Sequence, residues 1–184
     1  MLTAKKKEER IQGKTFLMSP AGMWHNKIGM NLARIIGNYL WGKRCEVFYE
    51  SKVVFDEENH FIPDLIIVCD RAKIKYGFVQ GAPDLVIEIL SPSTRTKDAR
   101  EKKAVYEKFG VKEYWLVDPI SETIDVYLRT ETGFVLDNTY HNYSDEEWEA
   151  LDEEERAEAM LLLKVSLYDD LVIDVKDVFR KYGE

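Results

Sequence analysis

Two similar six-residue segments, Pro63–Val68 and Pro83–Glu88, carry acidic side chains that could do chemistry. Both begin Pro-Asp-Leu, which supplies Asp64 and Asp84. Only the second ends on a carboxylate, Glu88, inside a run that continues as aliphatic residues. An ionised carboxylate that is buried without a partner costs several kcal/mol of stability. The pattern therefore indicates a cation beside Glu88, either a metal ion or a Lys or Arg side chain.

Asp64 and Glu88 are the pair that could bind one metal ion. Asp84 and Glu88 share a strand face, but four residues of strand span about 13 Å, too far for both to contact one ion. Neighbouring strands lie about 4.8 Å apart, so Asp64 and one carboxylate of the second segment can form a site with a backbone carbonyl and water. Such oxygen ligands favour Mg²⁺ or Mn²⁺. A Pro-Asp pair can also serve only the turn before a strand; that alternative is open for Asp64 and favoured for Asp84.

The helix predicted over residues 97–109 offers a positive charge. At 100° per residue, Lys102 falls in the middle of its apolar stripe and Asp98 falls on it one turn earlier, whereas Lys103 lies at the edge. The stripe consists of Ala99, Val105, Tyr106 and Phe109. A Lys among core-facing residues needs a carboxylate to face, so we expect Lys102 to meet Asp98 and the strand carboxylates. The alternative is an ordinary i,i+4 ion pair, which stabilises a helix by a few tenths of a kcal/mol.

The acidic charge of the chain is concentrated in one segment. The net charge of −8 equals the balance of residues 144–160, which hold nine acids and one base, so the rest of the chain is neutral. Between Arg95 and Lys112 there are seven bases and three acids. A basic region thus follows the strand that carries Glu88, and a nucleic-acid partner is not excluded.

The expected elements alternate between helices and strands, which predicts a single α/β domain with a mixed sheet flanked by helices. Residues 1–14 read as a polar lead-in and residues 144–160 as an acidic helical insertion. Helices are expected at 21–41 and 97–109, and strands at 45–55, 61–69, 83–90, 113–117, 123–128 and 171–175.

The composition excludes several classes of protein. With 184 residues the chain is one ordinary domain, and its apolar runs are far shorter than the roughly 18–20 residues of a membrane span. No apolar region follows the charged N-terminus, so a signal peptide is not expected. Cys45 and Cys69 are far apart, without a CxxC pattern, and fit a reducing cytoplasm. The three histidines show no metal-ligand spacing.

The segment from Gly81 to Thr94, GAPDLVIEILSPST, closely resembles the Uma-two family of predicted restriction endonucleases, as do Asp98, Glu101-Lys102 and the run EYWLVDP from Glu113 to Pro119. That family is assigned to the PD-(D/E)xK nuclease superfamily. The resemblance is dense over residues 61–119 and weaker in the first helix and the last strand.

The resemblance implies a nuclease core with a divalent metal. Asp64 matches the first acid of the superfamily, and Glu88 matches the acid of its (D/E)xK element, where the carbonyl of Ile89 would also face the metal. Leu90 stands where that element has Lys. In this family the Lys has moved to the following helix, which points to Lys102, the residue that the helical period indicates independently.

The resulting hypothesis is a cytoplasmic, Mg²⁺- or Mn²⁺-dependent endonuclease that hydrolyses DNA phosphodiester bonds. Lys102 would stabilise developing charge, Asp84 would support the site or bind the metal in a rearranged site, and Arg95 and Lys97 would contact phosphates. A symmetric homodimer would suit double-strand cuts. The alternatives are a catalytically degenerate module that binds nucleic acid or a protein, and a purely structural Lys–carboxylate cluster.

Overall fold

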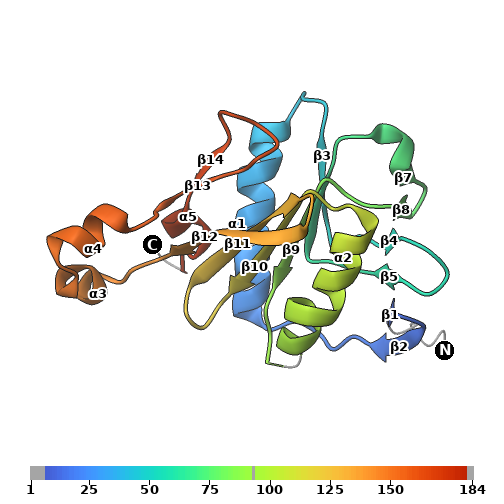
Figure 1. Cartoon of the computed structure of the whole chain (residues 1–184), viewed down its shortest axis with the longest axis horizontal. Coiled ribbons are helices and arrows are strands. Elements are labelled where there is room, and N and C mark those ends of the chain that lie inside the picture. The colour runs from blue at the N-terminus through green and yellow to red at the C-terminus, as the bar shows by residue number, and fades with distance from the viewer. Residues whose placement is uncertain (1–6, 93, 182–184) are drawn as a thin grey trace.

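A computed structural model describes residues 7–92 and 94–181, and its centre is a six-stranded mixed sheet (Figure 1). Within this sheet only β9 and β10 pair in parallel, and every other neighbouring pair is antiparallel. The Glu88 strand is central, as its apolar composition predicts. In spatial order the strands are β12 (Gly133–His141), β11 (Thr123–Thr130), β10 (Glu113–Asp118), β9 (Leu85–Ile89), β6 (Leu65–Val68) and β3 (Glu46–Tyr49).

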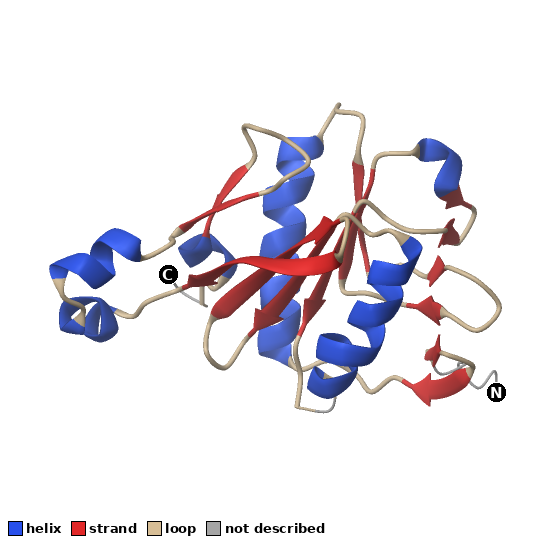
Figure 2. Ribbon diagram, viewed as in Figure 1, coloured by secondary structure: helices blue, strands red, loops and turns tan. Residues whose placement is uncertain are grey.

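Helices cover both faces of this sheet (Figure 2). The expected first helix is α1 (Met23–Leu40), and its buried face packs with Leu85, Ile87 and Ile89 of β9. The alternate residue Val86 faces the other side, where it shares a core with α2 (Lys103–Phe109). Side chains of a strand point alternately to its two faces, so β9 contributes to both layers of the core.

The helix that carries Lys102 is continuous but not uniform. It begins with the π-helical segment η2 (Lys97–Lys102) and continues as α2, which ends at Gly110 with φ of 91° in the left-handed region. Glycine adopts that conformation without steric cost, and the helix ends at residue 109, where the sequence predicts its end. Both Asp98 and Lys102 are buried, as the apolar stripe predicts.

A second, smaller sheet lies beside the α2 layer. Its strands differ from two of the expectations from the sequence. The strand expected at 45–55 is split, because the chain turns at Glu50 (φ 43°) and its two halves join different sheets. Residues 8–17, expected within or beside a polar lead-in, form a β-hairpin; residues 1–6 lie outside the described part of the chain. The order is β2 (Lys14–Leu17), β1 (Glu8–Ile11), β5 (His60–Phe61), β4 (Val53–Val54), β8 (Phe78–Gln80) and β7 (Ile74–Lys75), with the short helix η1 (Arg71–Lys73) before β7.

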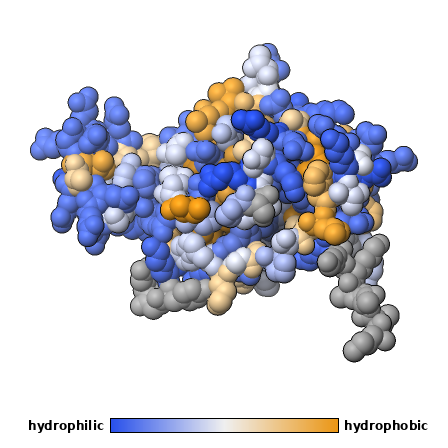
Figure 3. All heavy atoms as spheres, turned by 90° about the horizontal axis from the view of Figure 1, so that it is seen from below, coloured by the Kyte–Doolittle hydropathy of each residue, from blue (hydrophilic) through white to orange (hydrophobic). Residues whose placement is uncertain are grey.

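The acidic segment forms an arm that projects from the sheet (Figure 1). Its two short helices are α3 (Asp145–Ala150) and α4 (Glu153–Glu158), and each begins with a capping box. In a capping box the side chain of the N-cap residue accepts the backbone N–H of the residue three positions later, and the Glu side chain of that residue accepts the backbone N–H of the N-cap residue. Hydrophilic side chains dominate the surface of the arm in Figure 3. The helical expectation for this segment is therefore confirmed.

The chain returns from the arm to the face covered by α1. It forms the small hairpin of β13 (Leu162–Lys164) and β14 (Val172–Asp174), followed by α5 (Val175–Val178). The Glu113 side chain, which is fully buried, fastens this segment to β10. Its carboxylate accepts hydrogen bonds from Trp115 Nε1 at 2.6 Å and from the backbone N and Oγ of Ser166.

Cys45 and Cys69 form a disulfide between the ends of β3 and β6. The two residues are 24 positions apart in the sequence, and only the strand register brings them opposite one another. Their spacing alone does not indicate this pairing. In the part of the chain that the structure describes, no helix has the length and apolar character needed to cross a membrane.

We predict that Glu113→Gln lowers the free energy of unfolding by about 1–3 kcal/mol, because the new amide NH₂ would face buried hydrogen-bond donors. Urea unfolding followed by circular dichroism measures the change. Glu131→Gln in the exposed turn before β12 is the control and should change stability by less than about 0.5 kcal/mol. Equal stability of both variants would contradict the anchoring role of Glu113.

Candidate active site

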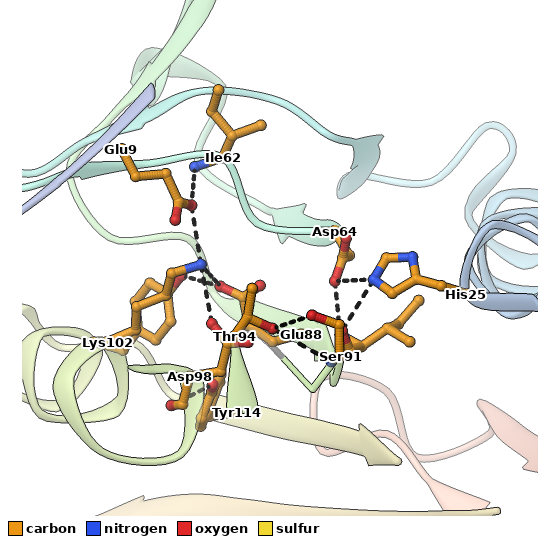
Figure 4. Close-up of polar contacts among 12 residues, drawn as sticks. Glu9, His25, Ile62, Asp64, Glu88, Ser91, Thr94, Asp98, Lys102 and Tyr114 are labelled. Atoms are coloured by element: carbon orange, nitrogen blue, oxygen red, sulfur yellow. Dashed lines mark hydrogen bonds and ion pairs between the residues drawn. The ribbon is translucent and has the colours of Figure 1, made fainter. Parts of the chain in front are cut away.

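The Lys102 side chain lies at the centre of a buried group of carboxylates (Figure 4). We call Glu9, Glu88, Asp98 and Lys102 the lysine–carboxylate cluster. Lys102 Nζ lies 2.9 Å from Glu9 Oε1, 3.1 Å from Glu88 Oε1 and 3.1 Å from Asp98 Oδ1. No side chain of the cluster is more than 7% exposed. The pairing is therefore more than the surface i,i+4 ion pair that the helix alone would allow.

Three layers of the fold supply these side chains. Glu9 comes from β1 of the small sheet, and its Oε1 also accepts the backbone N–H of Ile62 at 2.9 Å. Glu88 comes from the central strand β9, whereas Asp98 and Lys102 come from η2. A π-helical turn inside a helix is rare and often marks a functional site.

Two tyrosines hold the cluster in place. The Tyr106 hydroxyl donates a 2.6 Å hydrogen bond to Glu88 Oε1, and the Tyr114 hydroxyl donates to the backbone carbonyl of Asp98 at 3.0 Å. Both tyrosines are fully buried. The positions of the Glu88 carboxylate and of η2 are therefore each fixed by a second contact besides the ion pair.

The cluster holds more negative than positive charge. Burial raises the pKa of Glu88 well above its usual range; Lys102 opposes this shift, but Asp98, Asp64 and Glu9 add to it. Burial lowers the pKa of Lys102, but the surrounding carboxylates outweigh burial and raise it well above the ordinary value. Three carboxylates around one ammonium favour a further cation or a proton on Glu88.

Asp64 lies on the next strand beside this cluster. The antiparallel register pairs Leu65 with Ile87, which places Asp64 opposite Glu88. Asp64 Oδ2 accepts the backbone N–H of Ile89 at 2.7 Å. The expectation that Asp64 and Glu88 come from neighbouring strands is therefore confirmed by the strand register.

His25, from the first turn of α1, contacts two of the oxygens that are expected to bind a metal. Its Nε2 lies 3.0 Å from the carbonyl oxygen of Ile89 and 3.4 Å from Asp64 Oδ2. Burial alone would lower the pKa of His25, but the hydrogen bond and the charge of Asp64 raise it above the ordinary value. The imidazole Nδ1 is buried and has no hydrogen-bond partner among the described residues.

The chemistry of these groups fits a divalent cation. Asp64, Glu88 and the Ile89 carbonyl offer the hard oxygen atoms that Mg²⁺ and Mn²⁺ prefer, in surroundings with excess negative charge. The Glu88 carboxylate is, however, already hydrogen-bonded within the protein. Among residues 7–92 and 94–181, no three His, Cys, Asp or Glu side chains are gathered as a metal cluster, and Glu88 is held by Lys102 and Tyr106.

The other predicted site residues have different partners. Asp84 accepts the backbone N–H of Cys69 at 2.7 Å and pairs with Lys112 at 2.8 Å, at the opposite end of β9 from Glu88. Arg95 pairs with Asp118 at 2.7 Å. Lys97 Nζ lies 4.4 Å from the centre of the Phe16 ring. Of the predicted residues, the structure thus brings together Asp64, Glu88, Ile89 and Lys102.

Sequence reasoning missed Glu9 and His25. Glu9 lies in a stretch that reads as polar, although Gln12-Gly13 at its end is a turn signal for a hairpin. His25 has no metal-ligand spacing, because its partners are 39 and 64 residues further along the chain. Only the tertiary fold brings these side chains to the site.

The comparisons with known proteins agree with this fold. The sequence model of the Uma2 family, described as "Putative restriction endonuclease", matches residues 2–164. A crystal structure titled as "a putative nuclease belonging to DUF820 from Anabaena variabilis ATCC 29413" has a TM-score of 0.71 and covers 94% of this chain and 89% of that one. At 21% identity, this likeness shows the mixed α/β fold alone.

Two proteins of Synechocystis sp. are similar over about two thirds of the chain. "Uncharacterized protein slr1290" is 30% identical over 132 residues, which are 70% of each protein. "Uncharacterized protein sll1609" is 26% identical over 129 residues, which are 67% of this chain and 73% of that protein. With the family match over most of its length, the chain belongs to the Uma2 family.

Proposed function

We propose that this protein is a metal-dependent endonuclease that hydrolyses DNA phosphodiester bonds. The observation that carries the proposal is the buried ammonium of Lys102 among three carboxylates, with Asp64 directly across the strand pair from Glu88. Perturbed, buried ionisable groups of this kind are concentrated at catalytic sites. Membership of the Uma2 family supports the reaction class.

Each residue of the site has a defined role in this proposal. Asp64, Glu88 and the Ile89 carbonyl would hold Mg²⁺ or Mn²⁺, which when bound activates water and offsets charge on the phosphate. Lys102 would place its ammonium against the negative charge that develops on the scissile phosphate. Tyr106 would orient the Glu88 carboxylate through its 2.6 Å hydrogen bond.

The position of Lys102 explains how the site could work without a strand lysine. Leu90, which stands at the position of the superfamily Lys, is buried in the core on the α2 side. Lys102 reaches the Glu88 carboxylate from η2 instead, with Nζ 3.1 Å from Oε1. An ammonium group thus lies beside the metal-binding acid, although a different element supplies it.

DNA is the proposed substrate, and its phosphates would meet Arg95 and Lys97 near the start of η2. Arg95 would exchange its exposed ion pair with Asp118 for a phosphate, because surface ion pairs are weak. A symmetric homodimer would allow both strands to be cut. We place the activity in the cytoplasm, where the reducing pool would act against the Cys45–Cys69 disulfide of the structure.

A catalytically degenerate binding module is the second candidate. It is favoured by the closed state of Glu88, whose Oε1 accepts hydrogen bonds from both Lys102 and Tyr106, and by Leu90 in place of the strand lysine. Cleavage of supercoiled plasmid in Mg²⁺, Mn²⁺ or EDTA separates the two candidates. Metal-dependent nicking that is lost in Asp64→Asn supports the nuclease. DNA binding without cleavage in any metal would support the degenerate module.

We predict that Glu88→Gln abolishes cleavage but does not destabilise the metal-free protein. The pKa of Glu88 is raised, so its ionised form is penalised in the folded state, and the penalty grows as pH rises from the ordinary carboxyl pKa to the folded value. The stability of Glu88→Gln relative to wild type should therefore increase between pH 5 and pH 8, measured by urea unfolding in EDTA. A clear loss of stability at pH 8 would instead show that the ion pair with Lys102 outweighs the cost of burying the Glu88 charge.

We predict a large difference between two adjacent lysines. Lys102→Met should slow plasmid cleavage by a factor of about 100–1,000, because a positioned charge at a developing anion contributes about 3–4 kcal/mol. Mn²⁺ affinity should persist or rise, because a competing cation is gone. Lys103, whose Nζ lies over the Tyr127 ring, is the matched control.

Lys103→Met should cost little, and that cost should shrink at high salt. Circular dichroism of both variants checks that they fold. If Lys103 were essential and Lys102 dispensable, the assignment of the catalytic lysine would be wrong. Equal cleavage by both variants would exclude the relocated-lysine mechanism.

We predict that neutralising the arm strengthens DNA binding at low salt without changing cleavage at saturating DNA. The variant changes four exposed acids to Gln, namely Glu146, Glu149, Glu153 and Glu154. It keeps Glu147 and Glu155, because these two residues complete the capping boxes. Less long-range repulsion should lower the Kd, and the difference should vanish at high salt. Equal Kd values for both proteins throughout a salt series would contradict this prediction.

A further inference from the structure

We infer that the imidazole of His25 competes with the metal ion: its Nε2–H holds Asp64 and the Ile89 carbonyl in the metal-free protein and withdraws when the ion binds. This inference rests on the proposed function and assigns a positioning role to a residue outside the predicted ligand set. Figure 4 shows the His25 ring directed at Asp64, on the side away from Lys102.

The first argument is that one nitrogen serves two oxygens. Nε2 lies 3.0 Å from Ile89 O, within hydrogen-bond range, and 3.4 Å from Asp64 Oδ2, a longer electrostatic contact. When Asp64 is ionised, both oxygens are acceptors and neither can donate, so Nε2 must carry the proton of each contact. A metal ion bound by the same two oxygens would lie against that proton, so the ion and the Nε2–H compete for these oxygens.

The second argument concerns the other ring nitrogen. If Nε2 bound the metal, the proton of neutral His25 would move to Nδ1, which is buried and has no acceptor among the described residues. Histidines that bind metals almost always donate their second N–H to an acceptor. A buried N–H without a partner is costly, so the structure favours His25 as a donor to Asp64 and Ile89 and not as a ligand.

The third argument is that the ring can move only by rotating about its own side-chain bonds. One turn after His25, a Cβ on Gly29 would lie 2.7 Å from the Tyr49 ring and 3.3 Å from Ile89 Cδ1, so α1 packs tightly on the sheet there. Trp24 Nε1 also donates to the carbonyl of Pro119 at 3.3 Å. The first turn of α1 is thus fixed, and metal entry would turn the imidazole alone.

Mn²⁺ binding, followed by the loss of the free-ion electron paramagnetic resonance signal, tests the inference. His25→Ala should bind Mn²⁺ roughly twofold to tenfold more tightly than wild type, which is the effect of removing one competing hydrogen bond. His25→Gln keeps an N–H donor and should return toward wild-type affinity. His141→Ala is the control, since His141 lies on β12 and stacks on Tyr143, and it should leave the affinity unchanged.

A pulsed resonance measurement of bound Mn²⁺ gives a second readout. The wild-type complex should show no coupling to an imidazole ¹⁴N. Strong ¹⁴N coupling together with weaker binding by His25→Ala would make His25 a ligand and overturn the inference while leaving the proposed nuclease intact. Unchanged affinity in His25→Ala, with a folded protein by circular dichroism, would also overturn it. If neither wild type nor His25→Ala binds Mn²⁺ at millimolar concentration, the inference and the metal-dependent function both fail.

Discussion

The ammonium of Lys102 is the interaction on which the arrangement of the site depends. A buried Lys is stable only if carboxylates compensate for the hydration that it loses, and Glu9, Glu88 and Asp98 do so from three different elements. The small sheet, the central strand β9 and the helix must therefore meet at one point. The hairpin that carries Glu9 is held there by Ile62 as well as by Lys102. A peripheral β-hairpin thereby becomes part of the site.

The register of β6 and β9 is the second constraint. A shift of one residue in either strand would turn its side chains to the other face, because side chains alternate along a strand. The aliphatic residues fix the register, since Leu65, Ile87 and Ile89 must face α1 while Ile66 and Val86 face α2. Packing of the core thus decides which carboxylates meet. The carboxylates do not set the register; they occupy the positions that the aliphatic packing gives them.

Sequence reasoning succeeded where the signal is local and failed where it is tertiary. The period of the helix identified Lys102 and Asp98 as core-facing, and the apolar run identified β9 as central. The strand expected at 45–55 is two strands, because the left-handed backbone at Glu50 redirects the chain, and Glu is not a residue type that signals such a turn. His25 depends on contacts with residues far along the chain, which no periodicity within its own helix records. Local patterns therefore predicted the elements and part of the site, but not the residues that complete it.

Donors of the protein satisfy both strand acids from opposite sides. Lys102 and Tyr106 donate to Glu88, whereas Asp64 receives the N–H of Ile89 and faces His25. Each donor stabilises the acid that it contacts, so under the proposed function a metal ion would gain only the difference between its own interactions and those it displaces. Stronger compensation within the protein would therefore mean weaker metal binding. A single buried ammonium with three carboxylates leaves uncompensated negative charge, and that remainder is what would still attract a divalent cation.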